Sequence, residues 1–221
     1  MLDIEMIASS RLRDGSYSSA GAIVAMPFID AAMARQAAQL MAARAGCKGL
    51  VLAIHDDSHE GFVTLINRAF IMTQSPSFAY VAQDAFAGRN WLSLAQAALA
   101  ANAAGLAALN DGKWAGQLAS FGLVSRRWAR SVYGGYLFHP EYRSHYGDTE
   151  LSLIAEAQGT LCYDPNAVLV EIDWRKDQTP TNEADKALFD ARLRTGFDSR
   201  LTAAAAARRA SGPQQTMQRA R

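Results

Sequence analysis

Acidic residues follow each of the first four apolar runs that have the character of β-strands. The runs cover residues 22–29, 49–55, 77–83 and 105–110, and the acids that come after them are Asp30, Asp56, Asp57, Asp84 and Asp111. One acid at a strand end is commonly a turn former or a helix cap. Several carboxylates that converge repel one another and raise each other's pKa unless a cation lies between them. A divalent metal that carries a diphosphate would satisfy such a cluster.

The elements around these acids predict a scaffold that brings them together. Helical patterns at 30–46, 61–73 and 91–104 alternate with the four strand-like runs. Such alternation is typical of a mainly parallel sheet covered by helices, in which ligands bind beyond the carboxyl ends of the strands. Farther along, 117–125 and 160–172 favour strands, and 148–159 favours a helix. We therefore expect an α/β fold, with one domain built on a mixed, mainly parallel sheet flanked by helices.

The composition is that of one soluble, folded domain. The 221 residues include 22 Lys and Arg against 21 Asp and Glu, and 50% are hydrophobic. A chain of this length buries enough surface to be stable without disulfides, and Cys47 and Cys162 fit no disulfide or metal pattern. The first residues do not have the pattern of a signal peptide, and Gln96, Asn102 and Gly105 interrupt the apolar stretch 92–109. We expect a cytoplasmic protein without a membrane span.

Several catalytic templates are absent from the sequence. No GxGxxG follows the first strand-like run, which argues against a dinucleotide fold and against the glycine loop of nucleotidyltransferases. GxxxxGK(S/T) and GxSxG are also absent, which removes the main support for phosphate-loop NTPases and α/β-hydrolases. His55 and His59 stand four residues apart with acids between them and offer a zinc alternative. Their segment has the pattern of a turn rather than of a helix, which disfavours zinc.

Five motifs follow one another along the chain, namely AIVAMPFID, LVLAIHDDSHEGF, INRAF, FAYVAQDAFAGRNWL and YGDTELSLIAEAQG. In this order and spacing they resemble the GT-A-fold glycosyltransferases of the family-2 type, in particular small versions seen in phage and prophage. The resemblance covers about residues 21–174. It implies a single-domain GT-A-like fold, the fold of nucleotide-diphospho-sugar transferases.

The resemblance also implies roles for individual residues. The nucleotide side of the site would comprise Pro27, Asp30, Asp56, Asp57, Asn67, Gln83 and Asp84, and the metal ligands would be Asp84 and Asp173. The general base would be Asp148, with Glu150 as the alternative. Asp111 is expected on the acceptor side or at the metal. Gly134, Gly135 and Tyr136 are candidate acceptor contacts, because glycines let the backbone approach a ligand and a tyrosine can stack on a sugar.

These roles predict a metal-dependent glycosyltransferase that moves a sugar from a nucleotide-diphosphate donor to an acceptor hydroxyl with inversion. Mn²⁺ or Mg²⁺ would neutralise charge on the leaving diphosphate, and a base would take the hydroxyl proton. A UDP-sugar is the favoured donor. The sequence leaves three classes of acceptor: a glycan, a lipid-linked glycan and a modified nucleic acid.

One departure from the family pattern concerns the metal motif. The single acid Asp84 stands between Gln83 and Ala85, where the family has two acids. A non-catalytic nucleotide- or glycan-binding protein is therefore one alternative. A nucleotidyltransferase of related architecture is the other.

These patterns predict four parts of the chain. They are an N-terminal extension (1–20), the glycosyltransferase domain (21–180), a C-terminal helix (181–202) and a tail (203–221). The tail carries Arg208, Arg209, Arg219 and Arg221 and no acid. It has the composition of a helix that frays after Gly212, or of a weak anchor for nucleic acid.

Overall fold

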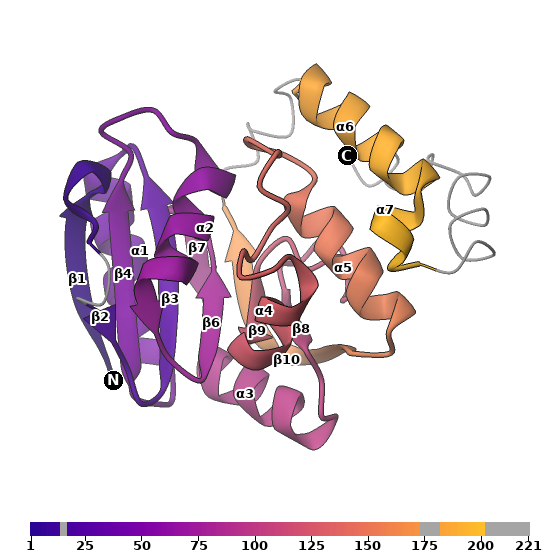
Figure 1. The fold of residues 1–221 in the computed structure, drawn as a ribbon. Coiled ribbons are helices and arrows are strands. Elements are labelled where there is room, and N and C mark those ends of the chain that lie inside the picture. The colour runs from indigo at the N-terminus through magenta and orange to yellow at the C-terminus, as the bar shows by residue number, and fades with distance from the viewer. Residues whose placement is uncertain (14–16, 173–181, 202–221) are drawn as a thin grey trace.

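An eight-stranded mixed sheet forms the centre of the protein (Figure 1). The computed structural model describes residues 1–13, 17–172 and 182–201, so Asp173 and the tail 203–221 lie outside the described residues. The strand order is β1-β4-β3-β6-β9-β8-β10-β7. The bounds of these strands are β1 Leu2–Ala8, β4 Gly49–His55, β3 Ala22–Phe28, β6 Ser77–Tyr80, β9 Gly122–Ser125, β8 Leu106–Asn110, β10 Leu161–Glu171 and β7 Ala85–Ala87. A separate parallel pair joins β2 (Tyr17–Ser18) to β5 (Thr73–Gln74).

The sheet is mainly parallel. β1, β4, β3 and β6 pair in parallel, and β8 pairs in parallel with β10. β9 is antiparallel to both β6 and β8, so β8 keeps the direction of β6. β7 pairs antiparallel with β10 at the far edge. The predicted fold class, an α/β domain with a mixed, mainly parallel sheet, is confirmed.

Helices cover both faces of the sheet. The helices are α1 Ala31–Arg44, α2 Phe62–Met72, α3 Trp91–Ala101, α4 Arg126–Val132, α5 Gly147–Ala157, α6 Glu183–Arg194 and α7 Gly196–Ser199, with a 3₁₀ turn η1 at Ser9–Arg11. α1 and α3 pack on one face, and α2, α4 and α5 pack on the other. α6 and α7 lie beyond α5 (Figure 1).

The central strand β3 shows why the sequence gives this arrangement. Every residue of β3 is buried. Ile23 and Ala25 belong to the core under α2 and α5, whereas Val24 and Met26 belong to the core under α1 and α3. A strand that is covered on both faces needs apolar residues at every position, which is the continuous run in the sequence.

Three elements differ from the sequence expectations. Residues 1–20 were expected to form only an extension, but Leu2–Ala8 is the edge strand β1, paired with β4 along its whole length. Its acids Asp3 and Glu5 are exposed and interrupt the apolar pattern, as is usual for an edge strand. The seven-residue helix α4, RRWARSV, follows β9 directly and is too short to give a clear helical period. The strand expected at 117–125 is confined to Gly122–Ser125.

Within the described ranges, no helix is long and apolar enough to cross a membrane. Cys47 and Cys162 are free thiols. Burial raises the pKa of the Cys162 thiol to about 11, so this side chain stays protonated and unreactive at neutral pH.

Candidate active site

The carboxyl ends of β4, β3, β6 and β8 lie at one edge of the sheet, because these strands share one direction. Asp56 and Asp57 follow β4 directly, and Asp111 follows β8. Asp30 comes two residues after β3, and Asp84 comes after a short loop behind β6. The topology therefore brings these acids to the same edge. This is where open α/β sheets bind their ligands.

Gln83 joins the loop after β6 to the end of β3. Its Oε1 accepts hydrogen bonds from the backbone N–H groups of Ile29 (2.8 Å) and Asp30 (3.0 Å). Because the oxygen makes both contacts, the amide orientation is fixed and the Nε2 group is directed away from them as a donor. Asp30 itself caps α1, since its Oδ1 accepts from the N–H groups of Ala32 (2.9 Å) and Met33 (3.0 Å).

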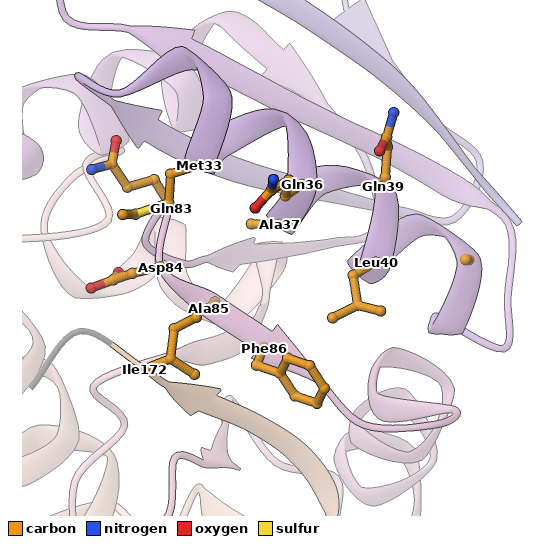
Figure 2. Close-up of a pocket in the computed structure, with 11 residues that line it drawn as sticks. Met33, Gln36, Ala37, Gln39, Leu40, Gln83, Asp84, Ala85, Phe86 and Ile172 are labelled. Atoms are coloured by element: carbon orange, nitrogen blue, oxygen red, sulfur yellow. The ribbon is translucent and has the colours of Figure 1, made fainter.

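Asp84 lies at one end of a cavity of about 500 Å³ between α1 and β7 (Figure 2). The Asp84 residue is only 1% exposed. Figure 2 shows Gln83 and Asp84 at one end of the lining and Leu40 and Phe86 toward the other. The lining is thus polar near the strand ends and mixed along α1, which contributes Gln36 and Gln39 beside Met33 and Leu40.

The two acids after β4 have different surroundings. The two oxygens of Asp56 accept from the N–H groups of Glu60 (2.8 Å) and Gly61 (3.0 Å), which closes a turn. Asp57 accepts from the Ser9 hydroxyl (2.7 Å) and from the hydroxyl (2.6 Å) and N–H (3.0 Å) of Ser10, and these bonds hold the pKa of its carboxyl well below the usual range. Asp57 therefore fastens the end of β1 to the end of β4. Asp56 keeps one lone pair on each oxygen for a further donor.

Asp148 begins α5 close to Asp111. Its side chain keeps partial solvent exposure and accepts from the Thr149 N–H at 2.8 Å. The pKa of the Asp148 carboxyl is raised to about 6, chiefly by burial and to a smaller extent by the carboxylate of Asp111. Asp111 is 2% exposed and closes its own turn by accepting from the N–H groups of Lys113 (2.8 Å) and Trp114 (2.9 Å) and from the Ser120 hydroxyl. The start of α5 thus meets the end of β8.

Glu150, two residues along α5, is fully buried. Its carboxylate accepts from the Tyr133 hydroxyl (2.8 Å), from the Tyr142 hydroxyl (2.7 Å) and from two nitrogens of Arg192 (2.9 and 2.7 Å). These four donor atoms come from three side chains and occupy both oxygens of the buried carboxylate. This environment favours a structural role for Glu150 and does not support its predicted role as an alternative base.

Asn67 and Pro27 also face the interior. The Asn67 Oδ1 accepts from the N–H groups of Leu137 (3.1 Å) and Phe138 (2.9 Å), and its Nδ2 donates to the Phe138 carbonyl (3.1 Å). Pro27 lies in β3 opposite Ile54 and is buried. Asn67 therefore holds the 137–138 segment against α2. The geometry gives neither residue a surface that a nucleotide would touch.

A hairpin between α4 and α5 presents the candidate acceptor contacts. Tyr133 and Tyr136 form a β-bridge, and the tip between them contains Gly134 at φ +62° and Gly135 at φ +112°. No atoms lie within 4 Å of the Cβ position at either glycine, and Tyr136 is 40% exposed. The stem of the hairpin is anchored and the tip is open to a ligand.

The described residues supply one carboxylate for the predicted metal. In the part of the chain that the structure describes, no set of three His, Cys, Asp or Glu side chains is placed to hold a metal ion. His55 instead stacks on Phe28, with the ring centroids 5.2 Å apart, which leaves the zinc alternative without support. Asp173, the predicted partner of Asp84, lies outside the described residues.

Two charged residues of α6 that join the site region were not predicted. Arg192 binds Glu150, and Asp185 accepts backbone bonds from the segment before α5. Both are buried on the same helix face as Phe189 and Leu193. The sequence carries one signal for them, since they occupy positions of the helical period where apolar residues are usual.

Comparison with known proteins bears on the fold. No protein-family model matches the chain, and no curated protein matches its sequence. Among solved structures, a mannosyltransferase from Pyrobaculum calidifontis, in complex with GDP-mannose and Mn²⁺, is similar with a TM-score of 0.56 and 13% sequence identity. The match covers 93% of this chain and 79% of that one. The chain shares the fold of this mannosyltransferase. At this identity the likeness establishes the architecture alone.

Proposed function

We propose that the protein is a metal-dependent glycosyltransferase that moves a sugar from a nucleotide-diphosphate donor to an acceptor hydroxyl, with inversion. The observation that carries the proposal is Asp148, a carboxylate of raised pKa that meets Asp111 at the strand-end edge. An acid whose pKa is raised in this way is characteristic of proton-transfer sites. The fold shared with a mannosyltransferase supports the same reaction class. A family-2 assignment and a phage-like origin remain predictions.

The donor would bind along the ends of β3, β4 and β6. Asp56 has the capacity to accept a hydrogen bond from a ring N–H of uracil or guanine, whereas Asp57 is already committed to Ser9 and Ser10. The Nε2 group of Gln83 is a fixed donor beside Asp84 and would bind an oxygen of the ribose or the diphosphate. The sequence resemblance favours a UDP-sugar. The mannosyltransferase structure contains GDP-mannose, so both bases are to be tested.

The metal would be held by Asp84. An ion that arrives with a diphosphate takes most of its ligands from phosphate oxygens and water and needs only one or two protein carboxylates. A single, 1% exposed aspartate beside a cavity fits that requirement. When bound, Mn²⁺ or Mg²⁺ offsets the charge of the leaving diphosphate. Asp173 remains the proposed second ligand.

Asp148 would take the proton from the acceptor hydroxyl. A base with a pKa of about 6 is ionised at neutral pH and is still basic enough to share the proton in the transition state. One-step displacement needs this base and no enzyme nucleophile, which is the reason for proposing inversion. Tyr136 and the tip formed by Gly134 and Gly135 would contact the acceptor, whether glycan, lipid-linked glycan or modified nucleic acid.

Calorimetry with nucleotide diphosphates tests the proposal. GDP and UDP would be titrated into the full-length protein with and without MnCl₂, and hydrolysis of GDP-mannose and of UDP-sugars would then be followed. We expect binding that depends on Mn²⁺ and slow hydrolysis of one donor class. Absence of binding to either nucleotide would overturn the proposal.

A second candidate is a non-catalytic nucleotide-binding protein. The observation that favours it is the single acid, Asp84, in the metal motif, with Gln83 committed to backbone N–H groups. Binding that is indifferent to Mn²⁺, with no hydrolysis of any donor, would support this candidate instead.

A further inference from the structure

A buried cluster around Glu150 connects three separate segments on the side of the site where the acceptor would bind. We call this side, formed by the 133–136 hairpin and the start of α5, the acceptor half. Glu150 belongs to the first turn of α5, Tyr133 to the stem of the 133–136 hairpin, and Arg192 to α6. Arg192 approaches Glu150 with Nε at 2.9 Å and a second nitrogen at 2.7 Å, so the pair is bidentate. The Tyr133 and Tyr142 hydroxyls complete the carboxylate at 2.8 and 2.7 Å. One carboxylate thus fixes the hairpin stem relative to the helix that carries Asp148.

A second contact joins α6 to the chain just before α5. The Asp185 carboxylate accepts from the backbone N–H groups of Arg143 (3.0 Å), Ser144 (2.9 Å) and His145 (2.9 Å). The Asn182 N–H in turn donates to His145 Nδ1 at 3.3 Å. Three consecutive N–H groups bound to one buried carboxylate leave this segment little freedom.

A third contact comes from the residues after α6. Arg200 Nε donates to the Val132 carbonyl at 2.9 Å, and the guanidinium lies 5.3 Å from the centroid of the Tyr133 ring. Asp198 accepts from both Arg192 and Arg200 at 3.1 Å, which ties this contact to the Glu150 cluster. The hairpin stem is therefore held from the C-terminal side, while its glycine tip remains open.

Stability alone does not account for this arrangement. Apolar residues of similar volume generally stabilise a protein at least as well as a buried ion pair, because the ion pair must offset the desolvation of two charges. What an ion pair adds is direction, since a bidentate guanidinium and carboxylate bind in one geometry. None of Glu150, Arg192 and Asp185 lies in the proposed substrate site. Glu150 and Arg192 hold the hairpin stem and the first turn of α5, and Asp185 holds the segment that leads into α5.

We propose that Glu150, Arg192 and Asp185 are positioning residues that set the first turn of α5 and the 133–136 hairpin in the geometry that transfer by Asp148 requires. α6 is accordingly part of the acceptor half of the site. The catalytic half of this inference, that the held geometry serves transfer by Asp148, rests on the proposed function. Its structural half, that α6 immobilises residues 133–150, stands on the contacts alone.

The test compares Arg192→Met with Arg194→Met in the full-length protein. Arg194 lies on the same helix but is exposed, which makes it the matched control. Three quantities are measured at a temperature where each variant is folded: hydrogen exchange of residues 133–150, affinity for GDP with MnCl₂, and kcat and KM for GDP-mannose hydrolysis. UDP and a UDP-sugar replace these probes if they are the better ligands.

For Arg192→Met we expect at least tenfold faster exchange in 133–150 and at least a tenfold lower kcat. The KM for the donor and the affinity for nucleotide should stay within twofold, and Arg194→Met should resemble the wild type in every measurement. Arg192→Lys keeps the positive charge but cannot form the bidentate contact with Glu150, so it should recover only part of kcat. Tyr142→Phe removes one bond to Glu150, keeps the ring and should give a smaller change in the same direction. This variant serves as the test if Arg192→Met does not fold.

Two outcomes would overturn the inference. If exchange in 133–150 does not rise above that of Arg194→Met, α6 does not hold these segments. If exchange rises while kcat per folded molecule is unchanged, the contacts are structural and the catalytic half is wrong. A wild-type protein that binds neither nucleotide diphosphate would instead overturn the proposed function and, with it, the catalytic half. The exchange measurement would then still decide the structural half.

Discussion

The strand-end edge has two halves of different construction, a proposed donor half at the ends of β3, β4 and β6 and a proposed acceptor half formed by the 133–136 hairpin and the start of α5. On the donor half, Asp30 and Asp56 make contacts within a few residues of themselves, capping α1 and closing the turn after β4. On the acceptor half, Glu150 and Asp185 bind groups about 40 residues away in the chain. Asp30 and Asp56 are therefore placed by the sheet and its local turns, and the more distant contacts of Gln83 and Asp57 join neighbouring strand ends. The acceptor half has the right shape only when α6 is docked, so the two halves should respond differently to substitution.

The largest effect is expected on the donor half, from Asp84→Asn. The substitution removes the carboxylate that would hold the metal and keeps the shape of the side chain. We expect a loss of Mn²⁺-dependent donor hydrolysis of about 10³ or more, the upper range for removing one electrostatic contact to a leaving group. Thermal unfolding should show that the fold is intact. Full activity in this variant would remove Asp84 from the metal site.

The next effect belongs to the acceptor half. Asp148→Asn should lower donor hydrolysis by about 10² to 10⁴, the usual contribution of a general base, with nucleotide affinity nearly unchanged. The side chain volume is kept, so a change in folding does not confuse the result. Glu150→Gln is the comparison, and an active Asp148→Asn beside an inactive, well-folded Glu150→Gln would move the base to Glu150.

The pH dependence separates the halves without a substitution. A general base works only when it is deprotonated, and the pKa of Asp148 is raised to about 6. At saturating donor and Mn²⁺, the hydrolysis rate should therefore fall about tenfold per pH unit below pH 6 and reach a plateau above about pH 7. Asp148→Asn should lack this acid limb. A rate that does not change between pH 5 and 8 in the wild type would contradict the assignment.

A smaller effect distinguishes the two acids after β4. Asp56→Ala should weaken binding of the preferred nucleotide diphosphate about tenfold, the effect of one hydrogen bond to a charged group. Asp57→Ala should leave that affinity within about twofold and lower the melting temperature, because Asp57 fastens β1 to β4. Calorimetry and thermal unfolding measure the two effects. If neither variant differs from the wild type in affinity, both acids are structural.

The smallest effect is expected outside both halves. Deletion of residues 203–221 should change donor hydrolysis by no more than about twofold, because no motif of the site lies there and their arginines contribute only charge. A loss confined to transfer onto a nucleic-acid acceptor would contradict this expectation. The tail would then be an acceptor-docking element.

The position of the acids at the strand ends was predictable from sequence because its signals are local. A strand buried on both faces is a continuous apolar run, and an acid at its end is visible beside it, as in the run that ends at Asp30. The carboxyl-end edge follows from the alternation of strands and helices. β1 was not predicted, although Leu2, Ile4 and Met6 alternate with Asp3 and Glu5, which is the period of a strand.

The acceptor half was predictable only in part because its contacts are distant in sequence. Asp148 and Glu150 stand in the same motif, and the motif does not say which one is buried. The difference comes from Arg192, which lies 42 residues farther along the chain. Asn67 is a similar case, since its partners Leu137 and Phe138 follow about 70 residues later. Side-chain partners at such separations are set by the fold and give no periodic pattern in the sequence.

The edge position of β1 has a consequence for synthesis on the ribosome. Translation releases β1 before β3 and α1, and its pairing partner β4 emerges only after them, so the nascent strand waits without its neighbour. An unpaired apolar strand invites aggregation, and exposed charges such as those of Asp3 and Glu5 are the usual protection. The bonds from Ser9 and Ser10 to Asp57 can form only once the turn after β4 has left the ribosome. Those bonds therefore form last and fix the end of β1 to the end of β4.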